Sequence, residues 1–289
     1  MLSFYSDGLR FNYATRGVGS HTCFFQHGIG GNLTQPFRFL IGPGERCSDL
    51  DETGSKFPRF RLAAFDFRAH GATPLGDPKE LRIDRFADDL IAFMDHLETE
   101  TGLLGGISMG AAVALSAALR YPRRCLGLVL SRPAWLNGSM SPTAVAAYTK
   151  AARLLQDESS PQIAVEKMEQ SDVYRRVAAA SADAGKSLLG QINCVVSDPS
   201  IREAAIARLL SLPTGQRGLD LKSASAITVP TLIMATPNDP MHPLGFAEAL
   251  AGAIPRASLI KLAPKEVNDG PHIAEVDLHA WRFLSSIIG

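Results

Sequence analysis

The chain has no excess of charge of either sign and no long apolar run. Its 289 residues include 29 basic and 29 acidic side chains, so the net charge gives no attraction to nucleic acid or to an anionic membrane surface. No apolar stretch approaches the roughly 20 residues that span a bilayer, and the first residues lack the basic and then apolar segments of a signal peptide. We therefore expect a cytoplasmic globular protein that binds neither nucleic acid nor membrane.

Cysteine is scarce, and the common metal-binding patterns are missing. The four cysteines (Cys23, Cys47, Cys125 and Cys194) lie far apart without metal-ligand spacing. Neither an H-E-x-x-H nor a C-x-x-C pattern occurs. We therefore expect no metal site, and buried free thiols where the cysteines fall in strands.

The most informative stretch that is present is G-x-S-x-G at 106–110, with Ser108 at its centre. A nucleophilic serine on a tight strand-to-helix turn has strained backbone angles, and bulky residues two positions away would collide with the adjoining strand and helix. A short apolar run precedes the pattern, and an alanine-rich segment at 109–119 follows it. The pattern predicts that Ser108 is a nucleophile at such a turn.

A second glycine-rich stretch, HGIGG at 27–31, follows an apolar run that is typical of a central strand. Acyl transfer builds negative charge on a carbonyl oxygen, and two fixed backbone N–H groups can stabilise it. We predict that Ile29 and Met109 supply these groups, with Gly28 and Gly30 beside the substrate. A dinucleotide-binding loop is disfavoured because the third glycine of its pattern is absent. A structural glycine turn stays open.

An acid and a histidine follow in the order that completes a triad. Asp239 leaves the expected strand at 229–235, where it could accept a hydrogen bond from the histidine and hold its tautomer. An ordinary turn aspartate before proline is the alternative. His272 lies beyond the next expected strand, at 257–262, and is predicted to take the proton of Ser108 and return it to the leaving group.

His242 is the rival of His272 for this role. It lies three residues after Asp239, on the edge of the sheet where the other site residues are expected. To reach Ser108 it would have to come from the acid's own loop, which would leave Asp239 poorly placed to orient it. We therefore predict that His242 lines the pocket and binds substrate.

The pattern of elements changes in the middle of the chain. Strands and helices alternate up to Ser131, as in a mainly parallel sheet covered by helices. Between 133 and 225 alanine-rich helical segments dominate, at 143–156, 161–170, 173–180, 187–196 and 201–212. The alternation then resumes and ends in a helix at 272–288. The sequence predicts a core formed by 1–132 and 226–289, with a helical cap at 133–225.

The cap and its borders are expected to set substrate specificity. Arg132 is the charged residue best placed to suit an anionic substrate, although pairing with a carboxylate of the protein is the commoner role of such an arginine. Trp135 follows it and is predicted to line the same pocket. The polar segment Gly42–Pro58 is interpreted as a surface insertion at the pocket mouth.

Taken together, these motifs resemble those of the α/β-hydrolases, from Phe11 to the last helix. The stretch FDFRAHG at 65–71 is similar to the D-x-R-G-H-G run of that superfamily. The chain most resembles its small esterases, lactonases and perhydrolases, including 3-oxoadipate enol-lactonases, which share the Ser-Met-Gly elbow and an Asp-Pro turn near the acid. The resemblance implies an α/β fold with a mainly parallel eight-stranded sheet, helices on both faces and an inserted helical cap. It also implies hydrolysis of a carboxylic ester or lactone through an acyl-enzyme, without metal or cofactor.

Three positions depart from that resemblance. Ala69 replaces the first glycine of the R-G-H-G run, Ala111 replaces a glycine after the elbow, and Pro271 stands directly before His272 where relatives have glycine. Two other functions stay open: hydrolysis of a carbon–carbon bond or perhydrolysis by the same serine, and ligand binding without catalysis. The expected partner is a small ester or lactone, and a homo-oligomer also stays open.

Overall fold

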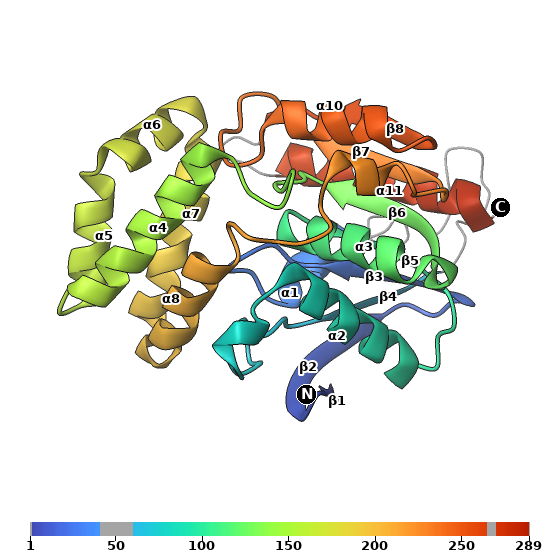
Figure 1. The fold of residues 1–289 in the computed structure, drawn as a ribbon, viewed down its shortest axis with the longest axis horizontal. Helices are drawn as coiled ribbons and strands as arrows, with labels where there is room; N and C mark the ends of the chain where they lie inside the picture. Colours follow the sequence, from blue (N-terminus) through green and yellow to red (C-terminus); the bar gives the residue numbers. More distant parts are fainter. Residues whose placement is uncertain (1, 41–59, 265–269, 289) are drawn as a thin grey trace.

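The structure is a computed structural model that describes residues 2–40, 60–264 and 270–288. One sheet has the strand order β1-β2-β4-β3-β5-β6-β7-β8 (Figure 1). Its strands are β1 (Leu2–Ser6), β2 (Leu9–Arg16), β3 (His21–Gln26), β4 (Phe60–Phe65), β5 (Gly102–Ile107), β6 (Cys125–Ser131), β7 (Thr231–Ala235) and β8 (Ala257–Lys261). Strand β2 pairs antiparallel with β1 and β4, and the other pairs are parallel. The predicted fold class is confirmed.

The central strands are buried along their whole length. Every residue of β5 and β7 is buried, which explains why these strands read as continuous apolar runs rather than as alternating patterns. Neighbouring residues nevertheless enter different hydrophobic clusters. Phe24 and Leu104 belong to one cluster, whereas Phe25 and Leu103 belong to the other. Since successive side chains of a strand point to opposite faces, the sheet is packed on both.

Helices supply the rest of these two clusters. The first cluster takes side chains from α2 (Ile83–His96), α3 (Met109–Arg120) and α10 (Leu244–Ala253), and the second takes them from α1 (Thr34–Phe39) and α11 (Gly270–Ile288). A short helix, α9 (Leu221–Ala224), precedes β7. The helices therefore cover both faces of the sheet, as predicted.

Six α-helices lie between β6 and β7 within the described residues, and the first five of them form the helical segment. These five are α4 (Pro142–Asp157), α5 (Pro161–Glu169), α6 (Asp172–Ala180), α7 (Ala182–Ser197) and α8 (Arg202–Ser211). Figure 1 shows them gathered beside the sheet. Serine hydroxyls cap the first four of them, accepting backbone N–H groups at Ser141, Ser160, Ser171 and Ser181. The presence of these helices confirms that the segment between β6 and β7 is helical. That it forms a separate cap domain at 133–225 stays a prediction.

Two expectations from the sequence concern the surroundings of this fold. In the part of the chain that the structure describes, no helix is long and apolar enough to cross a membrane. The insertion predicted at Gly42–Pro58 to border the pocket lies outside the described residues.

Candidate active site

Ser108 occupies a strained turn between β5 and α3. Its φ of 56° and ψ of −104° fall where residues with a side chain are rarely found. Packing around the turn is tight, since a Cβ at Gly106 would lie 2.5 Å from the carbonyl carbon of Gly110, and one at Gly110 would overlap the carbonyl oxygen of Gln26. The N–H of Ser108 donates to the carbonyl of Ser131 on β6 at 2.9 Å. The predicted elbow is present, and both glycines are there because of close backbone approach.

The imidazole of His242 lies between Ser108 and Asp239. Its Nε2 is 2.9 Å from Ser108 Oγ, and its Nδ1 is 2.8 Å from Asp239 Oδ2. An ionised carboxylate can only accept, so Nδ1 carries the proton and Nε2 presents its lone pair to the serine hydroxyl. This arrangement suits a general base next to a nucleophile.

A tight turn brings His242 to the acid of its own loop. Asp239 Oδ1 accepts the N–H groups of Met241 at 2.9 Å and of His242 at 3.2 Å, and the Asp239 carbonyl also accepts the latter at 3.2 Å. One carboxylate oxygen therefore fixes the turn while the other holds the ring. The expectation that Asp239 would be poorly placed to orient His242 is wrong.

The surroundings of Asp239 keep its carboxylate ionised. Burial raises the pKa of this group, but His242, Arg132 and the Met241 N–H together outweigh burial and bring the pKa well below its usual range. The Arg132 guanidinium lies 3.9 Å from Asp239 Oδ2. A permanently charged acid can stabilise the imidazolium that forms when His242 accepts a proton.

His272 does not lie where the sequence predicted. The position against Ser108 that was expected for it is occupied by His242. Helix α11 begins at Gly270, two residues before the predicted start at His272, so His272 falls in its first turn, and its side chain is buried. Its Nδ1 is 3.2 Å from the carbonyl oxygen of Ala263, and its ring packs edge-on against Phe39 with 6.4 Å between centroids. His272 is therefore part of the packing around the first turn of α11.

The glycine-rich loop lies against the elbow, and His27 fixes one of its peptides. A Cβ on Gly28 would lie 3.5 Å from the Cβ of Ser108. The Nε2 of His27 accepts the Phe67 N–H at 3.1 Å, so its protonated Nδ1 donates to the Gly28 carbonyl at 2.8 Å. Since the peptide is trans, the Ile29 N–H points away from that carbonyl. The role of this N–H as oxyanion donor, together with that of Met109, stays a prediction.

His27 makes the stability of the fold depend on pH. Burial lowers its pKa from 6.5 to about 4, so the unfolded chain takes up the proton first as the pH falls. The stability that neutral His27 contributes is therefore fully present above pH 6.5, the pKa in the unfolded chain. It is lost as the pH falls from 6.5 to about 4, the pKa in the folded protein. From about pH 7.5 to about pH 4.5, we expect wild-type protein to lose about 2.5 kcal/mol more stability than His27→Gln, measured by urea unfolding. An equal loss in both proteins would contradict this interpretation.

Two glutamines hold the same loop, and sequence reasoning missed one of them. Gln35 Oε1 accepts the Gly28 N–H at 2.8 Å. Gln191, on α7 of the helical segment, donates from Nε2 to the Ile29 carbonyl at 3.2 Å and packs against Gly30, where a Cβ would collide with its amide. Gln191 lies in the second half of α7 with no recognisable motif around it, so no local signal marks it.

Arg132 is paired with carboxylates of the protein, which is the role expected from the sequence as the commoner one for such an arginine. Its Nη1 lies 3.2 Å from Oδ2 of Asp183 on α7 and 3.9 Å from Oδ2 of Asp239. The guanidinium thus links the helical segment to the acid. Trp135 is 2% exposed and donates from Nε1 to the Leu212 carbonyl at 3.0 Å. The structure gives both residues packing contacts, and direct substrate binding by either stays a prediction.

A hollow of about 440 Å³ opens beside the acid. It is lined by Asn238, Asp239 and Pro243 from the loop after β7, by Leu244 at the start of α10, and by Ala180 from α6. Space for a small organic molecule therefore exists next to Asp239, the acid of the group formed by Ser108, His242 and Asp239. Among the described residues, no cluster of histidine, cysteine and carboxylate side chains is arranged to hold a metal ion.

Comparison with known proteins identifies the family. The sequence profile of the family described as "Serine aminopeptidase, S33" matches residues 42–265. The chain belongs to this family of α/β-hydrolases. It is therefore an enzyme of the hydrolase class, as its fold and its motifs predicted.

Individual relatives agree at the level of the fold and the broad class. The chain is 26% identical over 236 residues to 3-oxoadipate enol-lactonase 2 of Acinetobacter baylyi, covering 76% of this chain and 74% of that protein. An enol-lactonase structure from Burkholderia xenovorans aligns with a TM-score of 0.70 at 17% identity, covering 98% of this chain and all (100%) of that one.

A third relative shares only part of its length. The chain is 30% identical over 129 residues to the dihydrolipoyllysine-residue acetyltransferase component of the acetoin cleaving system of Cupriavidus necator. The match covers 44% of this chain and 30% of that protein, so the chain spans less than a third of this relative.

Proposed function

We propose that the protein hydrolyses a carboxylic ester or lactone through an acyl-enzyme on Ser108, with His242 as general base and Asp239 as the acid that orients it. The observation that carries the proposal is the pair of hydrogen bonds on His242, 2.9 Å to the serine and 2.8 Å to the aspartate. Nucleophile, base and orienting group within hydrogen-bond reach are the signature of nucleophilic catalysis.

The steps follow from these positions. Ser108 Oγ attacks the carbonyl carbon of the substrate while its proton moves to His242 Nε2, and the carbonyl oxygen becomes negative. The N–H groups of Ile29 and Met109 are proposed to stabilise that oxygen. When the tetrahedral intermediate collapses, the bond to the leaving oxygen breaks and His242 returns the proton to it. In a lactone, the leaving hydroxyl stays attached to the acyl group.

Water then repeats the sequence on the acyl-enzyme. His242 Nε2 takes a proton from water as the hydroxide oxygen bonds to the acyl carbon, and the proton returns to Ser108 as the ester bond to Oγ breaks. The product is a carboxylic acid. Two apolar walls of the hollow beside Asp239, at Ala180 and Leu244, suit a small aliphatic substrate group.

A substrate panel tests the choice of reaction. Turnover of p-nitrophenyl esters, of aliphatic lactones and of a β-diketone is measured with wild-type protein and with Ser108→Ala. We expect serine-dependent release of alcohol or ring-opened hydroxy acid. Cleavage of the diketone alone would favour carbon–carbon bond hydrolysis. Formation of a peracid from acetate and hydrogen peroxide, detected by a dye that reacts with the oxidised halide, would favour perhydrolysis. Either result without ester or lactone turnover would contradict the proposal.

Removing the charge of Asp239 is expected to cost much of the rate. Asp239→Asn can donate to His242 Nδ1 and so favours the wrong tautomer, which should lower kcat about a thousandfold to ten-thousandfold. Asp183→Asn is the matched control, because Asp183 also contacts Arg132 but does not touch the imidazole in any described hydrogen bond. We expect this control to stay within about tenfold of wild type. Equal losses in the two variants would show that Asp239 acts only through Arg132.

A further inference from the structure

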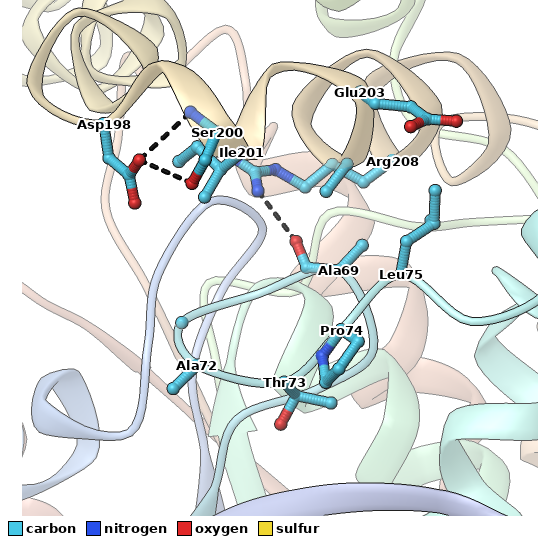
Figure 2. A pocket seen from close by; sticks show the side chains of 12 residues that line it. Ala69, Ala72, Thr73, Pro74, Leu75, Asp198, Ser200, Ile201, Glu203 and Arg208 are labelled. Carbon is cyan, nitrogen blue, oxygen red and sulfur yellow. Dashed lines mark hydrogen bonds between the residues drawn. The ribbon is translucent and has the colours of Figure 1, made fainter.

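A second cavity lies between the loop after β4 and helix α8. It has a volume of about 330 Å³ and is lined by that loop, between residues 69 and 75, by residues 198–201 directly before α8, and by α8 itself (Figure 2). None of the residues that line it is a member of the group around His242. The function proposed above therefore assigns it no role.

Arg208 is the charged side chain at the inner wall of this cavity. Only 3% of the residue is exposed. Figure 2 shows it extending from α8 over the loop, where Nη1 donates to the Ala69 carbonyl at 2.8 Å. Its Nη2 lies 3.4 Å from Cys194 Sγ. Both acceptors are uncharged, so they stabilise the position of the guanidinium without neutralising it.

One donor of this guanidinium has nothing to bind. Among the described residues, Arg208 Nε is buried and has no hydrogen-bond partner. Buried donors are rarely left in this state, because the lost hydration is not replaced. Burial also lowers the pKa of the Arg208 guanidinium, against the opposing effects of Cys194 and Tyr148. The hydrogen bond from Nη1 to the Ala69 carbonyl links α8 to the loop, but it leaves Nε without an acceptor and does not account for the cavity beside it.

The remaining walls restrict the kind of anion that would fit. Ala72, Pro74, Leu75, Ile201 and Ala204 form an apolar wall beside Arg208, and much of the remaining lining is polar. Two carboxylates, those of Asp198 and Glu203, line the outer part and are exposed. A ligand with a second negative charge at this rim would be repelled, whereas a neutral aliphatic body would pack on the apolar wall.

We propose that this cavity binds a small aliphatic monocarboxylate, with its carboxylate on the guanidinium of Arg208 and its body against the apolar wall. Arginine binds carboxylates through charge-assisted hydrogen bonds, which are stronger than those to neutral acceptors. The inference does not rest on the proposed reaction, although a carboxylic acid is also what that reaction would release. It assigns a second binding site, between the loop after β4 and α8.

Calorimetry with sodium butyrate tests the site, using Ser108→Ala so that no acyl-enzyme chemistry contributes. We expect saturable binding of butyrate, at least tenfold weaker binding of butyramide, and at least tenfold weaker binding of succinate and of inorganic phosphate. Equal binding of butyrate and butyramide, or no saturable binding of butyrate, would overturn the proposal. Tighter binding of phosphate would show a site for another kind of anion and would overturn it as well.

Variants place the ligand in this cavity. Adding Arg208→Gln should weaken butyrate binding at least tenfold, whereas Arg217→Gln, which removes an exposed arginine of the same segment, should leave it unchanged. Because Arg208 is buried, its replacement could impair folding. Ala204→Leu keeps the guanidinium, fills the apolar wall and should also weaken binding at least tenfold, and Glu203→Gln should strengthen succinate binding. Butyrate affinity within twofold of the parent in Ala204→Leu would overturn the proposal.

Discussion

Replacing Ser108 by alanine is expected to lower the turnover of a p-nitrophenyl ester by about a millionfold, to the level left by binding and oxyanion stabilisation alone. The covalent step disappears because no other hydroxyl is held on the elbow at 2.9 Å from His242 Nε2 among the described hydrogen bonds. The measurement is kcat for wild type and variant on the same ester, with active-site concentration fixed by fluorophosphonate titration of the wild type.

Ser116→Ala is the matched control. Ser116 is also a buried serine, and it lies two turns further along α3, the helix that begins at the elbow. We expect it to keep turnover close to that of wild type. If Ser108→Ala retained more than a few per cent of wild-type turnover, or if fluorophosphonate labelled it as fast as wild type, the nucleophile would have been misassigned.

His242→Ala should be almost as inactive as Ser108→Ala. Members of a nucleophile–base pair act as a unit, so removing the base costs about as much as removing the nucleophile, again about a millionfold in kcat. The physical reason is that Ser108 Oγ then has no acceptor for its proton in the described arrangement. Steady-state kinetics on the ester used for Ser108 measures this loss.

The control is His272, a buried histidine that lies away from Ser108. His272→Gln removes an imidazole that packs against Phe39 and reaches towards the Ala263 carbonyl. We expect lower stability and nearly unchanged turnover, measured on protein whose circular dichroism shows it to be folded. A His242→Ala variant within tenfold of wild type would contradict the role of His242.

Features that depend on local geometry could be predicted from the sequence. The elbow requires glycine on both sides of Ser108, because backbone atoms of Gln26 and Gly110 approach too closely for a side chain. That requirement leaves a pattern of five residues. The helical segment between β6 and β7 could also be predicted, because the alternation of strands and helices gives way there to helical patterns alone. In the structure, each of its first four helices begins at a capping serine.

The choice between the two histidines depended on details that leave no such pattern. His272 was expected to reach Ser108 from the start of the last helix, but its ring is buried in the first turn of α11, against Phe39. His242 was set aside because it shares a loop with Asp239. The turn that makes this possible depends on two N–H groups bound by one carboxylate oxygen, which sequence alone does not reveal.

Contacts between the helical segment and the site were also beyond prediction. Gln191 holds the Ile29 carbonyl, and Asp183 holds Arg132, yet each lies more than 50 residues from its partner in the chain. Both come from α7, whose sequence reads as an ordinary amphipathic helix. Only the tertiary contacts of α7, with the glycine-rich loop and with Arg132, give these polar side chains their positions.

The rate at which a fluorophosphonate modifies Ser108 tests the central claim most directly, because it reports proton removal from this serine without dependence on the substrate. Rates are compared for wild type, His242→Ala and His272→Ala, and the modified residue is located by mass spectrometry. The geometry predicts labelling at Ser108 that is nearly abolished in His242→Ala and close to wild type in His272→Ala. Rapid labelling of Ser108 in His242→Ala, with loss in His272→Ala, would contradict the assignment of the base.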